Sequence, residues 1–237
     1  MQTEKMRKID PHVHSNGVSR CSRVSCSEII EQKIKQGYDG AMLTNHCQAW
    51  YYPAEKHAEA MRGVVEEYER GLAYAKTRGF EFWLGIEVTI HDPFYSDWLL
   101  YGATAEFLLR TPCLYQLDQK ELFALCEENG VLLVQAHPFR DPIRPADPKY
   151  LHGLEINCTP GDLQRYTDVL RKAEEYRCLV TCGTDYHGPD RTFRGGTFVP
   201  DHVRSATDFA EYLRSATETK LFLGDESLTV PTFRQKK

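Results

Sequence analysis

Short apolar runs of strand length alternate with helical patterns along most of this chain. The runs lie at 41–43, 82–90, 98–101, 131–135, 154–156 and 179–181, with a first short one around Ile9. Between them, apolar residues recur at intervals of three or four, which predicts helices at 25–37, 53–76, 119–128, 162–176 and 208–216. Repeated strand-then-helix units favour an α/β fold with a parallel sheet and right-handed crossovers. About seven such units would close into a barrel.

Length and charge limit the classes of protein to which this chain can belong. With 237 residues, of which 41% are hydrophobic, the chain can bury a core as one domain spanning residues 1–237. The net charge is −5 and both signs are interspersed, so the chain offers no basic stripe for a nucleic-acid backbone and the charge disfavours a binder of long nucleic acids. No segment approaches the ~20 apolar residues that cross a bilayer, and the start has no apolar leader pattern. We expect a cytoplasmic protein without membrane contact. The sequence does not determine its oligomeric state.

The eight cysteines are dispersed and include no Cys-x-x-Cys pair. This pattern predicts neither a disulfide framework nor a zinc finger, so most of the thiols are expected to pack as small hydrophobic side chains. Cys21 and Cys47 are the possible exceptions, because both stand beside candidate metal positions.

Polar residues of metal-binding type follow the apolar runs. The first set is His12-Val13-His14, where strand alternation places both imidazoles on one face. A lone pair of this kind is weak evidence, but four later segments repeat the theme: Thr44-Asn45-His46, Gly85-Ile86-Glu87, Gln135-Ala136-His137-Pro138 and Gly183-Thr184-Asp185-Tyr186-His187. In a (β/α) barrel, residues at the carboxyl ends of the strands gather at one mouth. These residues should therefore converge in space.

Taken in order, these motifs resemble those of the PHP (polymerase and histidinol phosphatase) family of metal-dependent phosphoesterases. The resemblance extends from Asp10 to about Asp225. It implies a distorted seven-stranded (β/α) barrel that holds two or three divalent metal ions. It also implies hydrolysis of a phosphate ester.

The resemblance assigns ligands residue by residue. His12, His14, Glu87 and Asp185 match the first metal's set, with Glu87 as the bridge to a second metal completed by His137. Family members often place a further histidine at the start of the fourth strand, whereas this chain has Asp97. His91 is the alternative to Asp97, because it follows Glu87 by four residues and would face the same way in an extended strand. His46 and His187 match the third metal.

Three positions near these motifs leave alternatives open. The family's loop after His-x-His often supplies another histidine, but residues 15–21 contain none, so water, Cys21 or a substrate oxygen would have to serve. Asn45 stands where relatives commonly carry an acid, and an amide cannot supply full charge to orient an imidazole. Glu155 and Asn157 end a strand near the mouth and either orient ligands or close a loop.

The expected chemistry is hydrolysis of a small phosphomonoester, histidinol-phosphatase-like or nucleotide phosphatase in type. Two or three ions ~3.5–4 Å apart would polarise the phosphate and generate a bridging hydroxide. Imidazole and carboxylate ligands are compatible with zinc, manganese or iron. Arg140 is the first candidate for a phosphate contact and a catalytic role, because its planar fork suits a phosphate dianion. Arg20, Arg23 and Arg191 are further phosphate candidates, and His187 is a candidate proton donor.

Two other functions compete with this prediction. A PHP domain that binds metal or ligand without turnover is favoured by Asn45, Asp97 and the absent loop histidine. A metal-dependent hydrolase of carbon–nitrogen bonds ranks last, because such enzymes usually need a lysine at a strand end and no strand-like run here ends in one.

Overall fold

The computed structural model describes residues 5–232 and places their strands in two six-stranded sheets. The first sheet has the order β12-β11-β10-β1-β2-β4 and the second β3-β5-β6-β7-β8-β9. The strands of the first are β1 (Met6–Val13), β2 (Gly40–Leu43), β4 (Glu81–Leu84), β10 (Gly195–Pro200), β11 (Glu218–Leu223) and β12 (Glu226–Pro231). Those of the second are β3 (His46–Cys47), β5 (Ile86–Ile90), β6 (Ser96–Tyr101), β7 (Leu132–Gln135), β8 (Gly153–Asn157) and β9 (Leu179–Gly183).

The fold is α/β, as predicted, but the expected closed seven-stranded barrel is not confirmed. Among the described residues, the two sheets meet through a single parallel bridge between Val13 and Tyr186 rather than a continuous ladder. The prediction of a parallel sheet is also only partly right. β5, β6 and β7 pair antiparallel, as do β1, β10, β11 and β12. Short links such as residues 91–95 make hairpins, because a parallel pair needs a long crossover.

Gly85 divides the apolar run that the sequence presented as one strand at 82–90. The residues before it form β4 in the first sheet, and those after it form β5 in the second. A Cβ at Gly85 would lie 2.8 Å from the Met42 sulfur and 3.1 Å from a Thr44 methyl. Only glycine lets the chain pass this closely beside β2 and change sheets.

The longer helices follow the sequence prediction. They are α1 (Cys26–Lys35), α2 (His57–Arg78), α4 (Gln119–Glu128) and α7 (Ala206–Ser215), whereas the predicted helix at 162–176 is split into α5 (Pro160–Leu163) and α6 (Tyr166–Tyr176). A capping box formed by Ser25 and Glu28 begins α1. The sequence missed α3 (Ala105–Arg110), β3, β10, β11 and β12. Three 3₁₀ turns occupy Ala54–Lys56, Leu114–Gln116 and Pro148–Tyr150.

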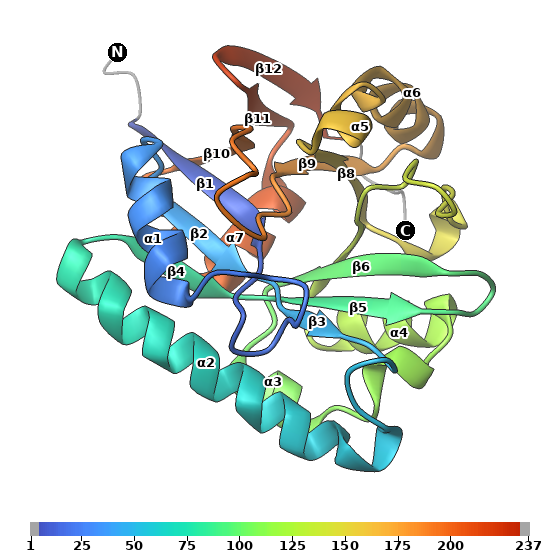
Figure 1. Ribbon diagram of the computed structural model, residues 1–237. Helices are drawn as coiled ribbons and strands as arrows, with labels where there is room; N and C mark the ends of the chain where they lie inside the picture. The colour runs from blue at the N-terminus through green and yellow to red at the C-terminus, as the bar shows by residue number, and fades with distance from the viewer. Residues whose placement is uncertain (1–4, 233–237) are drawn as a thin grey trace.

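Apolar side chains pack between the sheets and the helices around them. α2 runs along one side of the molecule beside β4 and α1 (Figure 1). Trp98 on β6 packs in one cluster with Met61 on α2, while its neighbour Leu99 joins Phe209 of α7 on the other face. This arrangement leaves the strand ends to carry polar groups. Within residues 5–232, no helix combines the length and apolar character that crossing a bilayer would require.

Candidate metal centre

The two imidazoles of His-x-His share one face at the end of β1. His12 and His14 are completely buried, and their ring centroids are 5.0 Å apart. Val13 between them packs into an apolar cluster with Ile29 and Leu43. Strand alternation therefore produces the shared face that the sequence predicted.

The Glu87 carboxylate lies between four imidazoles. Its Oε1 is 3.4 Å from His12 Nε2 and 3.2 Å from His137 Nε2. Its Oε2 is 2.8 Å from His46 Nδ1 and 3.4 Å from His14 Nε2. Parallel pairing of β3 with β5 sets His46 opposite Glu87. The two oxygens thus face different pairs of nitrogens, which is the position that a bridging ligand needs.

Asp185 approaches the same imidazoles from the end of β9. Its Oδ1 is 3.4 Å from His12 Nε2, 3.2 Å from His14 Nε2 and 3.2 Å from His187 Nδ1. Asp185 and His137 have backbone φ angles of 50° and 31°, which residues other than glycine rarely adopt. Backbone strain of this kind clusters at functional sites.

The geometry favours Asp97 over His91 as the additional oxygen or nitrogen donor. Asp97 belongs to a group with Glu87 and His137, in which the three ligand atoms lie within 4.8 Å of one another. Thr89 Oγ1 donates to Asp97 Oδ1 at 2.6 Å. Burial and the Glu87 charge raise the pKa of Asp97. His91 is exposed and contacts the Tyr95 ring instead.

A third group brings His14, His46 and His187 together, again with ligand atoms within 4.8 Å. The His14 ring stacks on the rings of His46 and His187, with centroid distances of 4.4 Å and 4.3 Å. Cys21 Sγ lies 3.0 Å from His187 Nε2. Burial would raise the pKa of Cys21, but hydrogen bonds from His187 and His46 lower it to about 5.

Several of these buried atoms have no hydrogen-bond partner. They are Nε2 of His12 and His14, Nδ1 of His46 and Oε2 of Glu87. Leaving a buried polar atom unpaired costs about 1–3 kcal/mol, so native proteins rarely do so without a reason. Convergent imidazole nitrogens and carboxylate oxygens are the donor set of first-row divalent metals. The residues present therefore fit the two or three divalent ions that the sequence resemblance implied.

Electrostatics in the cluster keep the Glu87 and Asp185 carboxylates ionised. Burial would raise the pKa of Glu87, but the charges of His46 and His12 hold it well below its usual range. The pKa of Asp185 is likewise low, because His12 and His14 outweigh the effect of burial. Burial, together with His187 and His46, holds the pKa of His14 well below its usual value. At neutral pH, His14 is therefore an uncharged imidazole beside two carboxylates.

Glu155 orients two of the imidazole residues. Its Oε1 lies 2.7 Å from His12 Nδ1, and its Oε2 accepts from the backbone N–H of His137 at 3.2 Å and from Asn157 at 3.0 Å. A carboxylate on the far nitrogen of an imidazole fixes the ring orientation and raises its basicity. Of the two interpretations that the sequence left open for Glu155, the geometry favours orientation of ligands.

Asn45 has a different task from the acid that relatives carry there. Its Oδ1 accepts hydrogen bonds from the Ser15 N–H at 2.8 Å and the Ser19 hydroxyl at 2.9 Å. It therefore holds the loop after His-x-His rather than the His46 ring.

A buried ion pair behind the cluster was missed by sequence reasoning. Lys33 on α1 is completely buried, and its Nζ lies 2.5 Å from Asp10 Oδ2 and 3.0 Å from Thr184 Oγ1. Asp10 Oδ1 accepts from the N–H groups of His12 and Thr184. The pair thus joins the His-x-His strand to the segment carrying Asp185. A helix lysine facing inward is the one signal that the sequence offered.

Five residues of the cluster line a hollow of about 820 Å³, namely His46, Asp97, His137, Asp185 and His187. Arg140 Nη2 lies 2.9 Å from Asp185 Oδ2 and 2.5 Å from Asp162 Oδ2, and Arg191 Nη1 lies 3.2 Å from Asp185 Oδ2. Arg20 also lines the hollow. Arg23 does not line it and pairs with Asp190. The structure therefore brings three of the four predicted phosphate-binding arginines to the site.

Aromatic residues form part of the wall of this hollow, namely Trp50, Tyr51 and Tyr95. Trp50 is 79% exposed, so it stands at the rim of the hollow.

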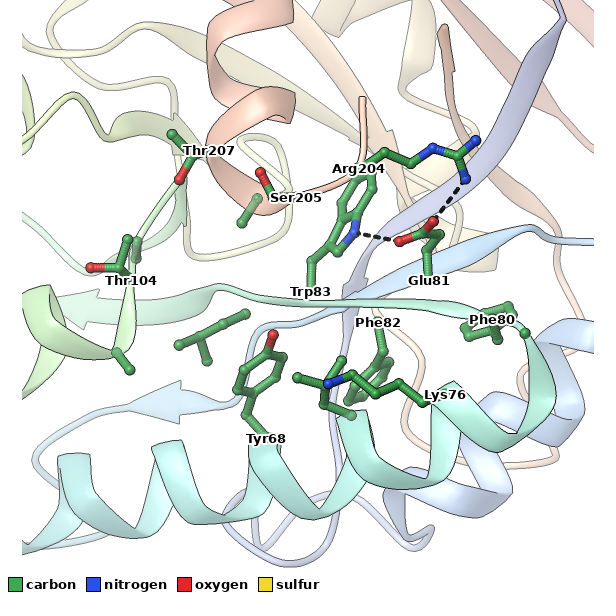
Figure 2. Close-up of a pocket in the computed structure, with 16 residues that line it drawn as sticks. Tyr68, Lys76, Phe80, Glu81, Phe82, Trp83, Thr104, Arg204, Ser205 and Thr207 are labelled. Atoms are coloured by element: carbon green, nitrogen blue, oxygen red, sulfur yellow. Dashed lines mark hydrogen bonds and ion pairs between the residues drawn. The ribbon is translucent and has the colours of Figure 1, made fainter. Parts of the chain in front are cut away.

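A second hollow, of about 580 Å³, lies between α2, β4 and the start of α7. Figure 2 shows the Arg204 guanidinium reaching Glu81, which also accepts from the Trp83 indole. Lys76 and Tyr68 line its other side (Figure 2). It contains none of the site residues that the sequence predicted.

Comparison with known proteins gives matches in structure alone. No protein-family model and no curated protein sequence matches the chain. A two-domain protein from Bacteroides vulgatus that contains a predicted PHP-like metal-dependent phosphoesterase is 19% identical, with a TM-score of 0.64 over 94% of this chain. The chain spans 66% of that protein, slightly under two thirds of its length.

Two further solved structures share the fold. A candidate metal-dependent phosphoesterase from Bifidobacterium adolescentis is 17% identical, with a TM-score of 0.53 over 78% of this chain and 90% of its own. An amidohydrolase from Chromobacterium violaceum is 14% identical, with a TM-score of 0.54 over 77% of this chain and 88% of its own. At these identities the likeness concerns the fold alone. The resemblance seen in the sequence motifs is confirmed at that level: this chain has the fold of PHP-like metal-dependent phosphoesterases.

Proposed function

We propose that this protein is a metal-dependent hydrolase that cleaves a small phosphomonoester. The observation that carries the proposal is the set of buried, unpartnered nitrogen and carboxylate atoms around Glu87, directly beside Arg140 and Arg191. The donor atoms suit divalent cations, and the guanidinium groups add positive charge on the open side. A phosphate dianion needs both.

The assignment of residues follows the groups in the structure. His12, His14 and Glu87 form one group and would hold one ion together with Asp185, whose Oδ1 lies within 3.4 Å of both imidazoles. Glu87, Asp97 and His137 would hold a second. His46 and His187, from the group that they form with His14, would hold a third. When bound, such ions polarise phosphate oxygens and make water a nucleophile near neutral pH. Zinc, manganese and iron all suit these ligands.

The chain's own residues bind and orient the substrate. Arg140 is shared between Asp162 and Asp185, so its fork is already ordered at the mouth and loses little side-chain entropy on binding phosphate. Arg191 and Arg20 supply further positive charge. His187 is buried beside Asp185 and lines the hollow, and where its imidazole holds no ion it would deliver a proton to a leaving oxygen.

The size of the hollow favours a small substrate over a long nucleic acid. About 820 Å³ lies within the range of sites for small molecules, and the chain carries a net charge of −5. Trp50 and Tyr51 at the rim can contact an apolar or flat portion of the substrate.

The test is a release assay on metal-free protein to which Mn²⁺, Zn²⁺ or Fe²⁺ is returned. Phosphate should be released from phosphomonoesters and not from oligonucleotides, and Glu87→Gln should abolish the release. Bound metal without turnover on any phosphate ester would overturn the proposal in favour of a binding role.

Hydrolysis of a carbon–nitrogen bond is the second candidate, because the Chromobacterium violaceum structure that shares the fold is named an amidohydrolase. The buried Lys33 does not serve as the lysine such enzymes use, since its amine is paired with Asp10. Release of ammonia from an amide panel, with no phosphate release, would establish this alternative.

A further inference from the structure

Cys21 is the one cysteine that lies in the hollow of the metal centre. Its Sγ is 3.0 Å from His187 Nε2, and His46 also lies within hydrogen-bonding reach of the thiol. The Tyr51 hydroxyl donates to the same sulfur at 3.1 Å. Two imidazoles and a phenol therefore surround one exposed thiol.

A second, independent observation points to a ligand at this place. His14 is completely buried, its Nε2 has no hydrogen-bond partner, and that residue forms a group with His46 and His187. Because His14 serves the first ion, His46 and His187 alone leave a tetrahedral third ion short of donors. The sulfur of Cys21 adjoins both of them.

The loop that carries Cys21 is held in place by the same residues. The Ser22 hydroxyl donates to the His14 carbonyl at 2.7 Å, and the Arg23 N–H donates to the His187 carbonyl at 2.9 Å. On the other side, Ser19 donates to Asn45 at 2.9 Å. The loop therefore fixes the position of Cys21 relative to both ends of the histidine group.

We propose that Cys21 is a sulfur ligand of the third metal position, with His46 and His187, and that this position selects zinc or another thiophilic ion over manganese or magnesium. On binding, a metal–sulfur bond replaces the thiol S–H bond and the proton passes to solvent. Soft sulfur donors favour zinc, whereas manganese and magnesium prefer oxygen. The inference rests on the proposed function, because it requires the cluster to bind metal.

The direct readout is the absorption spectrum of the Co²⁺-substituted protein. A sulfur ligand gives an intense near-ultraviolet charge-transfer band, which imidazole and carboxylate ligands do not give. We expect this band in the parent protein as the last equivalent of Co²⁺ binds, and its loss in Cys21→Ser. We also expect Cys21→Ser to weaken the weakest-bound Zn²⁺ at least about tenfold, the low end of what loss of an outer-shell partner costs.

The matched control is Cys113→Ser, which changes the other partly exposed cysteine at a position outside the hollow. It should keep both the band and the Zn²⁺ affinity of the parent. If the parent binds several Co²⁺ ions without the band, or if Cys21→Ser retains it, the inference fails while the proposed function stands. If elemental analysis of the parent finds that it binds no divalent metal, the proposed function fails as well.

Discussion

The hollow of the metal centre, of about 820 Å³, and the outer hollow between α2, β4 and α7, of about 580 Å³, differ in how their polar atoms are paired. In the outer hollow, Arg204 and Trp83 both bond to Glu81, so the polar atoms of these three side chains have partners within the chain. In the metal centre, Nε2 of His12 and His14, Nδ1 of His46 and Oε2 of Glu87 converge yet lack hydrogen bonds. The difference indicates that unpaired buried donors, rather than volume or charge, distinguish a candidate site from a surface depression.

Glu87→Gln gives the strongest test of this comparison. The amide keeps the shape but cannot bridge cations, so phosphate release should fall about 10³-fold, as when a principal transition-state contact is removed. Bound metal should fall in parallel, measured by elemental analysis. Glu81→Gln, the matched change in the outer hollow, should leave both unchanged per folded molecule. Equal losses in the two variants would contradict the distinction.

Lys33→Met should leave the buried carboxylate of Asp10 without its cation, and so create an unpaired polar group like those of the metal centre. The change should lower the free energy of unfolding by about 3–5 kcal/mol, measured by urea titration. Lys35→Met, on the exposed side of the same helix, should change stability by no more than about 0.5 kcal/mol. A small effect at Lys33 would show that the pair is not needed.

Glu155→Gln separates an orienting carboxylate from an ordinary one. The amide weakens the hold on His12, so metal affinity should fall about 10- to 100-fold, measured by competition with a chelating dye. The control is Glu127→Gln, which alters a similar carboxylate–imidazole pair with His152 outside the cluster. Metal affinity should be unaffected there, and a comparable loss would argue for a general effect on folding.

Arg140→Ala tests the positive charge at the open side of the metal centre. Loss of a charged hydrogen bond to phosphate should lower kcat/KM about 10- to 100-fold, with metal content unchanged. Arg140→Lys should recover part of this loss. Arg204→Ala removes the arginine of the outer hollow and should leave kcat/KM at the parent value. If Arg140→Ala and Arg204→Ala lowered kcat/KM equally, the arginines would act through long-range electrostatics and not through contact with the substrate.

The pH dependence of stability should also differ with and without metal. In the metal-free protein, the low pKa values of Glu87 and Asp185 stabilise the fold above about pH 4, and this contribution is lost on acidification. Burial lowers the pKa of His46, but Glu87 outweighs this effect and raises it to about 10. The contribution of His46 to stability is therefore complete below about pH 6.5 and is lost as the pH rises toward about 10.

The thermal midpoint of metal-free protein should therefore be highest between about pH 5 and 6.5. Zn²⁺ competes with protons for the imidazoles, so the stabilisation it adds should increase from pH 6 to pH 8 in calorimetric scans. A zinc effect that is equal at both pH values would contradict binding through these histidines.

The sequence determined which side chains form the candidate metal centre. His12, His14, Glu87 and Asp185 could be identified because each follows an apolar run, and the ends of neighbouring strands lie close together whatever the details of the sheet. α4 could be predicted at its true bounds, since its capping box and apolar spacing are local signals.

Only the tertiary structure decided how these segments pair. The sequence of the run 82–90 does not reveal that the residues before and after Gly85 join different sheets. Periodicity indicates which residues are buried, but not which strand is the partner. The contact of Cys21 with His187 and the ion pair of Lys33 with Asp10 join residues far apart in the chain. Local patterns follow from the sequence, whereas unpaired atoms and long-range contacts exist only once the whole chain has packed.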